Sequence, residues 1–95
     1  MVIRIDNEKI GRIADYYGWD SQLRQLAEEC SELSVESLHY IRERGATERL
    51  SEEIVDVLIM IQQIIYLLRD DVEKLEKYAD FKLDRQLGRI DSWVE

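Results

Sequence analysis

Proline is absent from this chain of 95 residues, and glycine occurs only four times. Because proline breaks helices and glycine weakens them, the scarcity of both favours long, uninterrupted helices. Leu, Ile, Glu, Arg and Asp are the most frequent residues, a composition typical of helical proteins. We therefore expect an all-α fold, and the length suffices for a single domain over residues 1–95.

Cysteine and histidine each occur once, as Cys30 and His39. One cysteine cannot form an internal disulfide, and the position of Cys30 between Leu26 and Leu33 predicts a buried, reduced thiol and a cytoplasmic location. Zinc prefers cysteine and histidine ligands, which this chain lacks in sufficient number. A di-iron site built from ExxH motifs is also excluded, because it needs two such motifs and only Glu36 has a histidine three residues later.

Positive charge and long apolar runs are also scarce. The formal net charge of −8 disfavours direct binding to nucleic acid, so an anionic ligand would need a metal ion as mediator. The first residues contain no apolar stretch of the length that a signal peptide requires. The most apolar segment, 54–68, is too short and too polar to span a bilayer, so no membrane association is expected.

Apolar residues at helical spacing predict four helical segments. The first covers roughly residues 8–17, with Asp6 or Asn7 as its N-cap and Gly18 at its end. The second covers roughly residues 20–42 and carries one continuous apolar stripe. Together these two segments account for the first half of the chain.

The third segment begins between Thr47 and Ser51 and continues to about Leu68. It is apolar nearly all round, which predicts the central helix of a four-helix bundle. The fourth covers roughly residues 72–90, with its apolar residues facing inward: Val72, Leu75, Tyr78 or Ala79, Leu83, Leu87 and Ile90. Because so short a chain buries a small core, we also expect the bundle to associate as a homodimer or homotetramer.

Carboxylates border the apolar stripe of the second segment. At 100° per residue, five side chains fall within an arc of about 80°: Gln22, Gln25, Glu29, Glu32 and Glu36. The third segment carries Glu53 and Asp56 at the same i, i+3 spacing, and Asp56 is the only charged residue from 54 to 68. An ionised carboxylate among so many apolar side chains is costly unless a cation neutralises it.

Two neighbouring helices that each present an i, i+3 pair of acids can direct four carboxylates at one or two divalent cations. Ligation by oxygen alone fits Mg²⁺, with Mn²⁺ as the possible substitute, and favours phosphoryl chemistry. Glu32 and Glu53 differ in their distance from the bend by roughly 9 Å of helix. We therefore expect residues 43–50 to form a partly extended connector that runs back along the second helix.

The acidic motifs resemble a known family. Glu28-Glu29-Cys30-Ser31-Glu32, followed by Glu53-Ile54-Val55-Asp56, is similar to the EExxE…ExxD signature of the MazG-like all-α nucleoside triphosphate pyrophosphohydrolases. The resemblance covers about residues 22–89 and is strongest to short, single-domain, phage-type members. It implies an enzyme that cleaves a nucleoside triphosphate to the monophosphate and pyrophosphate.

The resemblance also implies roles for individual residues. Glu29, Glu32, Glu53 and Asp56 would hold Mg²⁺, and Glu28 and Glu29 would be the catalytic carboxylates. Phosphate oxygens would meet basic residues of the last helix, and the nucleotide would meet polar and aromatic residues around the second segment. These substrate contacts would be Lys82, Arg85 and Arg89 for the phosphates, and Gln22, Gln25 and Trp19 for the nucleoside.

Two other readings of the sequence stay open. With 21 acidic residues in the chain, acidic helix faces can serve solubility alone, as they would in a non-catalytic helical interaction module. A related pyrophosphohydrolase that acts on phosphoribosyl-ATP in histidine synthesis would carry a similar signature. The sequence leaves open the preferred base and sugar, and whether the task is removal of damaged nucleotides or control of nucleotide pools.

Overall fold

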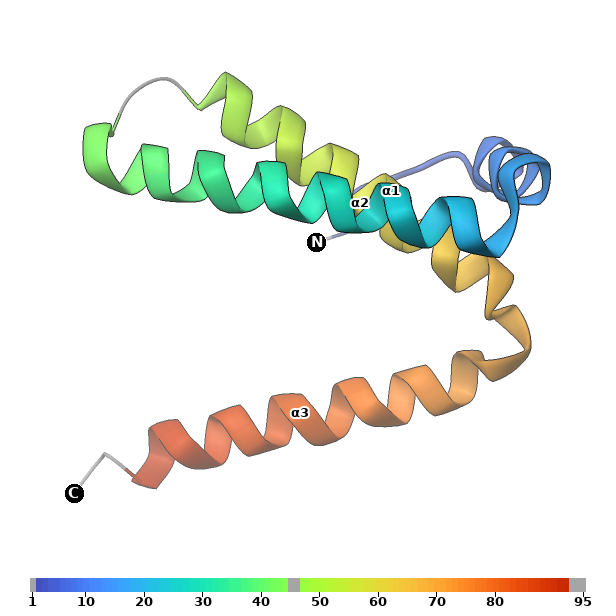
Figure 1. The fold of residues 1–95 in the computed structure, drawn as a ribbon. Coiled ribbons are helices and arrows are strands. Elements are labelled where there is room, and N and C mark those ends of the chain that lie inside the picture. Colours follow the sequence, from blue (N-terminus) through green and yellow to red (C-terminus); the bar gives the residue numbers. More distant parts are fainter. Residues whose placement is uncertain (1, 45–46, 93–95) are drawn as a thin grey trace.

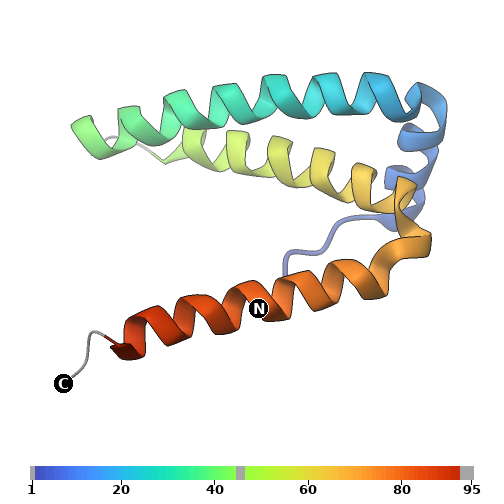
Figure 2. The same ribbon diagram turned by 60° about the horizontal axis from the view of Figure 1, so that its bottom comes forward.

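The computed structural model describes residues 2–44 and 47–92. Its regular elements, within these residues, are all helical: α1 (Asn7–Glu43), α2 (Glu48–Leu67), the short 3-10 helix η1 (Arg69–Asp71) and α3 (Val72–Ser92). The expected all-α class is confirmed. α1 and α2 lie side by side as an antiparallel hairpin, and α3 forms a separate arm (Figures 1 and 2).

The beginning of α1 is fixed by its N-cap and then bends at Gly18. A carboxylate oxygen of Asp6 accepts hydrogen bonds from the backbone N–H groups of Glu8 and Lys9, at 3.0 and 3.1 Å. Gly18 has φ 81° and ψ 176°, a conformation that side chains with a Cβ rarely adopt. The predicted boundary at Gly18 is confirmed as a kink, with one helical stretch before it and another directly after it. Because both stretches belong to α1, the described residues count three α-helices where four segments were expected.

The contact between α1 and α2 contains the small core of the protein. Among the described residues the buried apolar side chains are Ile10, Ala14, Val57 and Met60. At the end of the hairpin near Gly18, close packing of α1 against α2 depends on Gly11. A Cβ at this position would lie 2.9 Å from Cε2 of Tyr66.

A polar contact fixes the same end of the hairpin. The hydroxyl of Tyr66 donates a hydrogen bond to Oδ2 of Asp15 at 2.8 Å, and this bond is the main reason that the pKa of Tyr66 is raised. The first turns of α1 are therefore held against the last turns of α2.

The inward-facing stripe predicted for the last helix is wrong for a single chain. No described residue of α3 is buried, and Leu83, Leu87 and Ile90 are 57–60% exposed. The physical reason is the turn at η1, which directs α3 away from the hairpin (Figure 1). One chain therefore does not form a four-helix bundle.

Two further burial predictions are corrected. Cys30 is exposed, because α1 packs against one helix only and its stripe is covered only in part. For the same reason α2 is not a central helix: Ile54, Val55 and Ile61 are each about two-fifths exposed, at 44%, 41% and 39%.

The expected connector over 43–50 is shorter than predicted. α1 ends at Glu43 and α2 begins at Glu48, which leaves 44–47 between them, and residues 45 and 46 lie outside the described part. α1 nevertheless extends beyond the start of α2, so the two helices are offset along their axes (Figures 1 and 2). Among the described residues, no helix combines the length and apolar character that a membrane span requires.

Candidate functional site

Three of the predicted carboxylates meet where α1 and α2 run side by side. Glu29 comes from the middle of α1, and Glu53 and Asp56 come from successive turns near the start of α2. One carboxylate oxygen from each lies within 4.8 Å of the others. The offset between the helices is what brings residues at unequal distances from the bend to the same level.

Glu32 joins this group through Glu53. The pKa of Glu53 is raised, chiefly because the carboxyl is desolvated, and further because the negative charges of Glu32, Asp56 and Glu29 lie near it. Glu32 and Glu53 also line one shallow cavity together. The structure thus brings Glu29, Glu53 and Asp56 close to one another and places Glu32 beside Glu53, and we call these four residues the acid cluster.

Two oxygens of the acid cluster are buried without a partner in the described protein: Oε2 of Glu29 and Oε2 of Glu53. The other oxygen of Glu29, Oε1, accepts a hydrogen bond from Nε2 of Gln25 at 2.9 Å, which orients the carboxylate. Buried carboxylate oxygens without a donor are costly, and a hard divalent cation would supply the missing interaction. The donor set contains oxygen alone, so the residues present fit Mg²⁺ or Mn²⁺.

The predicted catalytic residue Glu28 is exposed, and the acid cluster incorporates its neighbour Glu29 instead. Consecutive helical residues point about 100° apart, which accounts for the difference.

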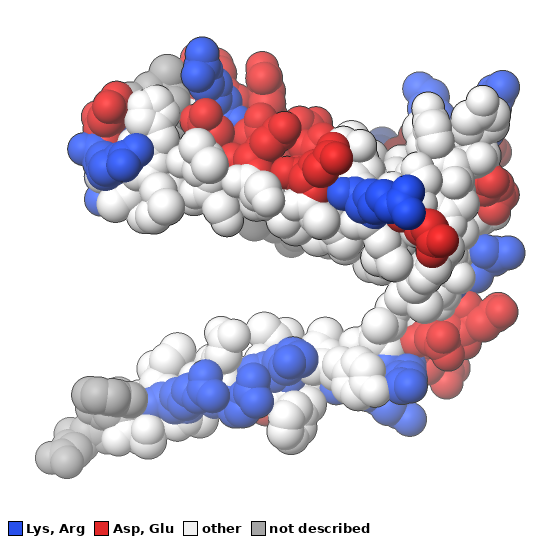
Figure 3. Space-filling view, viewed as in Figure 1, with Lys and Arg blue, Asp and Glu red and all other residues white. Residues whose placement is uncertain are grey.

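The predicted phosphate-binding residues Lys82 and Arg85 lie on α3, apart from the acid cluster. Figure 3 shows a row of basic residues along the arm and acidic residues across the hairpin, separated by open space on this face. Arg85 lies over the ring of Phe81, 5.9 Å from its centroid. One chain therefore does not bring its own basic row to its own carboxylates.

The predicted nucleoside contacts Gln22 and Gln25 line one cavity next to the acid cluster. Its volume is about 290 Å³, and Gln63 and Met60 of α2 and Ile13 and Tyr17 of α1 complete most of its lining. Gln22 is buried and accepts a hydrogen bond from Nε2 of Gln63, which also contacts Sδ of Met60 at 3.4 Å. Trp19, which is 43% exposed, does not line this cavity.

Sequence reasoning gave Gln63 no role in the site. Its position seven residues after Asp56 was the available signal, because seven residues are two helical turns. The contribution of Tyr17 depends on the bend at Gly18: the sequence predicted a helix end there, but not the direction in which the bend turns Tyr17.

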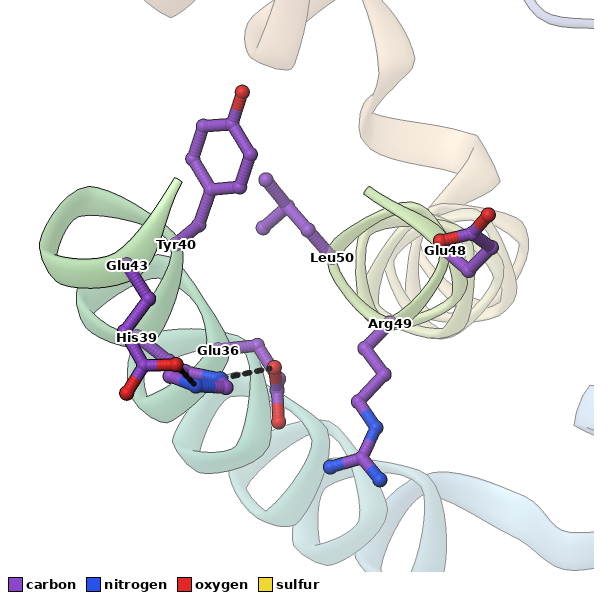
Figure 4. Close-up of a pocket in the computed structure, with 7 residues that line it drawn as sticks. All are labelled: Glu36, His39, Tyr40, Glu43, Glu48, Arg49 and Leu50. Atoms are coloured by element: carbon purple, nitrogen blue, oxygen red, sulfur yellow. Dashed lines mark hydrogen bonds and ion pairs between the residues drawn. The ribbon is translucent and has the colours of Figure 1, made fainter. Parts of the chain in front are cut away.

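A second cavity, of about 390 Å³, lies at the far end of the hairpin (Figure 4). His39 dominates its chemistry: Nε2 lies 2.9 Å from Oε2 of Glu43, and Nδ1 lies 3.5 Å from Oε2 of Glu36. The hydrogen bond with Glu43, and then that with Glu36, raise the pKa of His39. Arg49 from α2 also lines this cavity, so charges of both signs face it.

Comparison of the chain with protein-family models, with curated proteins and with solved structures finds no match in any of the three. Any functional conclusion therefore depends on the residues of this chain and their geometry.

Proposed function

We propose that this chain is a Mg²⁺-dependent pyrophosphohydrolase that cleaves nucleoside triphosphates to the monophosphate and pyrophosphate. The single observation that carries the proposal is the acid cluster, in which carboxylates from two helices converge and two buried oxygens lack a partner. The resemblance of the two acidic motifs to the MazG-like enzymes supports the same assignment. Manganese would serve as a substitute, since it accepts the same oxygen ligands.

The four carboxylates would hold the cation, and Gln25 would keep Glu29 in position through its hydrogen bond. When bound, Mg²⁺ supplies charge neutralisation for the triphosphate oxygens and Lewis acidity at the scissile linkage. Water cleaves the anhydride between the α and β phosphates, and pyrophosphate leaves. The proton released from water passes to a carboxylate, for which Glu29 and its exposed neighbour Glu28 are the candidates.

The cavity beside the acid cluster would hold the base. Its volume of about 290 Å³ is small for a whole nucleotide, since ligand sites generally begin near roughly 300 Å³. Gln22, Gln25 and Gln63 offer amide donors and acceptors, whereas Met60 and Tyr17 offer surface to a ring. These properties fit a heterocyclic base whose phosphates extend toward Glu29.

The test is to incubate the protein with each canonical ribonucleoside and deoxyribonucleoside triphosphate plus Mg²⁺ and to measure pyrophosphate release. The Asp56→Asn variant removes one acid from the cluster and should lose nearly all activity. Asp70→Asn is the matched control, because it makes the same chemical change at an exposed residue of η1. Undiminished turnover by Asp56→Asn would reject the assignment.

A non-catalytic helical interaction module is the second candidate, and the exposed apolar residues of α3 favour it. It predicts no effect of Mg²⁺ on the protein. Under the enzymatic proposal, Mg²⁺ relieves repulsion among the four carboxylates, so millimolar Mg²⁺ should raise the melting temperature. Thermal unfolding with and without the cation therefore separates the two candidates.

A further inference from the structure

One side chain borders both parts of the candidate site. Gln25 lines the cavity that we assign to the base, together with Gln22 and Gln63. Its Nε2 also donates a hydrogen bond of 2.9 Å to Oε1 of Glu29. In the part of the chain that the structure describes, no other side-chain hydrogen bond joins a residue of this cavity to the acid cluster. Gln25 is therefore the direct polar link between the cavity and the carboxylates.

The two carboxylate oxygens of Glu29 have different surroundings. Oε1 accepts the hydrogen bond from Gln25, whereas Oε2 is buried and has no partner among the described residues. The bond therefore holds one oxygen of the carboxylate and leaves the buried one for a cation. A hydrogen bond that orients a metal-binding carboxylate generally changes metal affinity by about 10–100-fold, so the contact with Gln25 matters for the cation.

The chemistry of the two groups fixes the direction of the Gln25 amide. An ionised carboxylate only accepts hydrogen bonds, so the NH2 group of Gln25 must be the part that contacts Glu29. Oε1 of Gln25 remains an acceptor, and within the described residues it has no hydrogen-bond partner. A base in the cavity can therefore donate an N–H to this oxygen while the bond to Glu29 stays intact.

The bond between Gln25 and Glu29 contributes little in the free protein. Gln25 is exposed, so water competes for both groups, and holding a glutamine in one rotamer costs conformational entropy. A base in the cavity would exclude this water and would restrict the same side chain. Both effects favour the orientation of Glu29 that the structure shows.

We propose that a nucleobase in the cavity raises the affinity of the acid cluster for its divalent cation, with Gln25 as the positioning residue that joins the two. The inference rests on the proposed function, because it needs both the cation at the carboxylates and the base in the cavity. Such coupling is reciprocal, so the cation raises the affinity for the base by the same factor. We expect a factor of about five, at the lower end of the usual range of coupling.

The coupling makes base recognition act on turnover as well as on binding. A nucleotide whose base fits the cavity poorly would leave Glu29 less well oriented, and the cation would be held less tightly. A variant that breaks the link at Gln25 should therefore narrow the differences in kcat among the nucleoside triphosphates.

The first experiment measures Mn²⁺ binding by electron paramagnetic resonance, with uncharged nucleosides as probes. The four canonical deoxynucleosides carry a base but no phosphate that could bind the cation. At saturation, at least one of them should lower the Kd of the wild type for Mn²⁺ about fivefold, whereas 2-deoxyribose alone should leave it unchanged. Isothermal titration should show that Mn²⁺ strengthens the binding of the same nucleoside by the same factor.

The variant Gln25→Met separates the positioning of Glu29 from the shape of the cavity. Methionine keeps the length of the side chain and its surface for a ring, but it donates no hydrogen bond to Glu29. The variant should bind Mn²⁺ about tenfold more weakly, and nucleosides should no longer change that affinity. Gln86→Met makes the same change at an exposed residue of α3 and should keep both values. Glu32→Gln should weaken Mn²⁺ binding but keep the effect of the nucleoside.

The outcomes separate this inference from the proposed function. A wild type that binds Mn²⁺ and a nucleoside without mutual effect would overturn the inference and leave the proposed function in place. Equal coupling in the wild type and Gln25→Met would also overturn it, as would a wild type that binds no nucleoside at millimolar concentration. A wild type that binds no Mn²⁺ would reject the proposed function, and this inference with it.

Discussion

The side-chain amide of Gln63 donates a hydrogen bond to Oε1 of Gln22, and both side chains are almost fully buried between α2 and α1. This pair links the two helices next to the acid cluster and forms part of the lining of the adjacent cavity. The contact therefore belongs both to the core and to the candidate site.

Replacing Gln63 by leucine should destabilise the protein by about 1–3 kcal/mol, because the amide of Gln22 is then buried without its partner. The double variant Gln22→Leu/Gln63→Leu should recover much of this loss, since both polar groups are removed together. Urea unfolding measures both values. Equal destabilisation by the single and double variants would contradict the pairing.

Glu53 should make the metal-free protein less stable as the pH rises. Its pKa is raised above the ordinary 4.5, so the folded state holds this proton more tightly than the unfolded state does. Stability is therefore lost from about pH 4.5 upward, through the folded pKa, and the stabilisation by Mg²⁺ should grow over the same interval.

The variant Glu53→Gln tests this directly. It should be more stable than the wild type at neutral pH without metal, because the substitution removes the charge repulsion among the carboxylates. It should also respond less to Mg²⁺, because it removes one of the proposed metal ligands. Glu52→Gln is the control, as an exposed neighbour with the same chemistry. Thermal unfolding at several pH values gives the answer, and identical responses of the two variants would count against the acid cluster.

His39 should stabilise the end of the hairpin only while it is protonated. Its pKa is raised above 6.5 by Glu43 and Glu36, so its contribution is complete below pH 6.5 and is lost as the pH rises through the folded pKa. The effect should be small and weakened by salt, because the group is exposed to solvent. Comparing the pH dependence of unfolding for the wild type and His39→Gln measures it, and parallel curves from pH 6 to 8 would refute it.

Gly11→Ala should destabilise the protein by about 1–3 kcal/mol, because overpacking forces side chains from their positions. The added Cβ would lie 2.9 Å from the ring of Tyr66 and would displace its hydroxyl from Asp15. Gly88→Ala is the control: a Cβ there meets nothing within 4 Å. Because Gly88 lies inside a helix, its replacement by alanine should raise the free energy of unfolding by about 0.5–1 kcal/mol. Losses of equal size at both glycines would disprove the close packing at Gly11.

The elements and the acid cluster were predictable because both depend on local periodicity. The environment expected for Asp56 was wrong: it is the single charged residue of an apolar segment, but its side chain is exposed, because α2 is covered on one side only. The position of α3 was not predictable in this way. A stripe of apolar residues indicates that a helix is covered, but not which surface covers it, and the turn at 69–71 decides the direction. Cys30 was misjudged for the same reason, because the stripe on α1 exceeds what one neighbour can cover.

The bend at Gly18 divides the α1 side of the cavity beside the acid cluster into two walls. Ile13 and Tyr17, on one wall of the cavity, precede the bend, whereas Gln22 and Gln25 follow it on the same helix segment as Glu29 and Glu32. A side chain with a Cβ at position 18 would strain the backbone at φ 81° and would disturb how these two walls meet. The shape of this cavity therefore depends on one glycine that lies outside its lining.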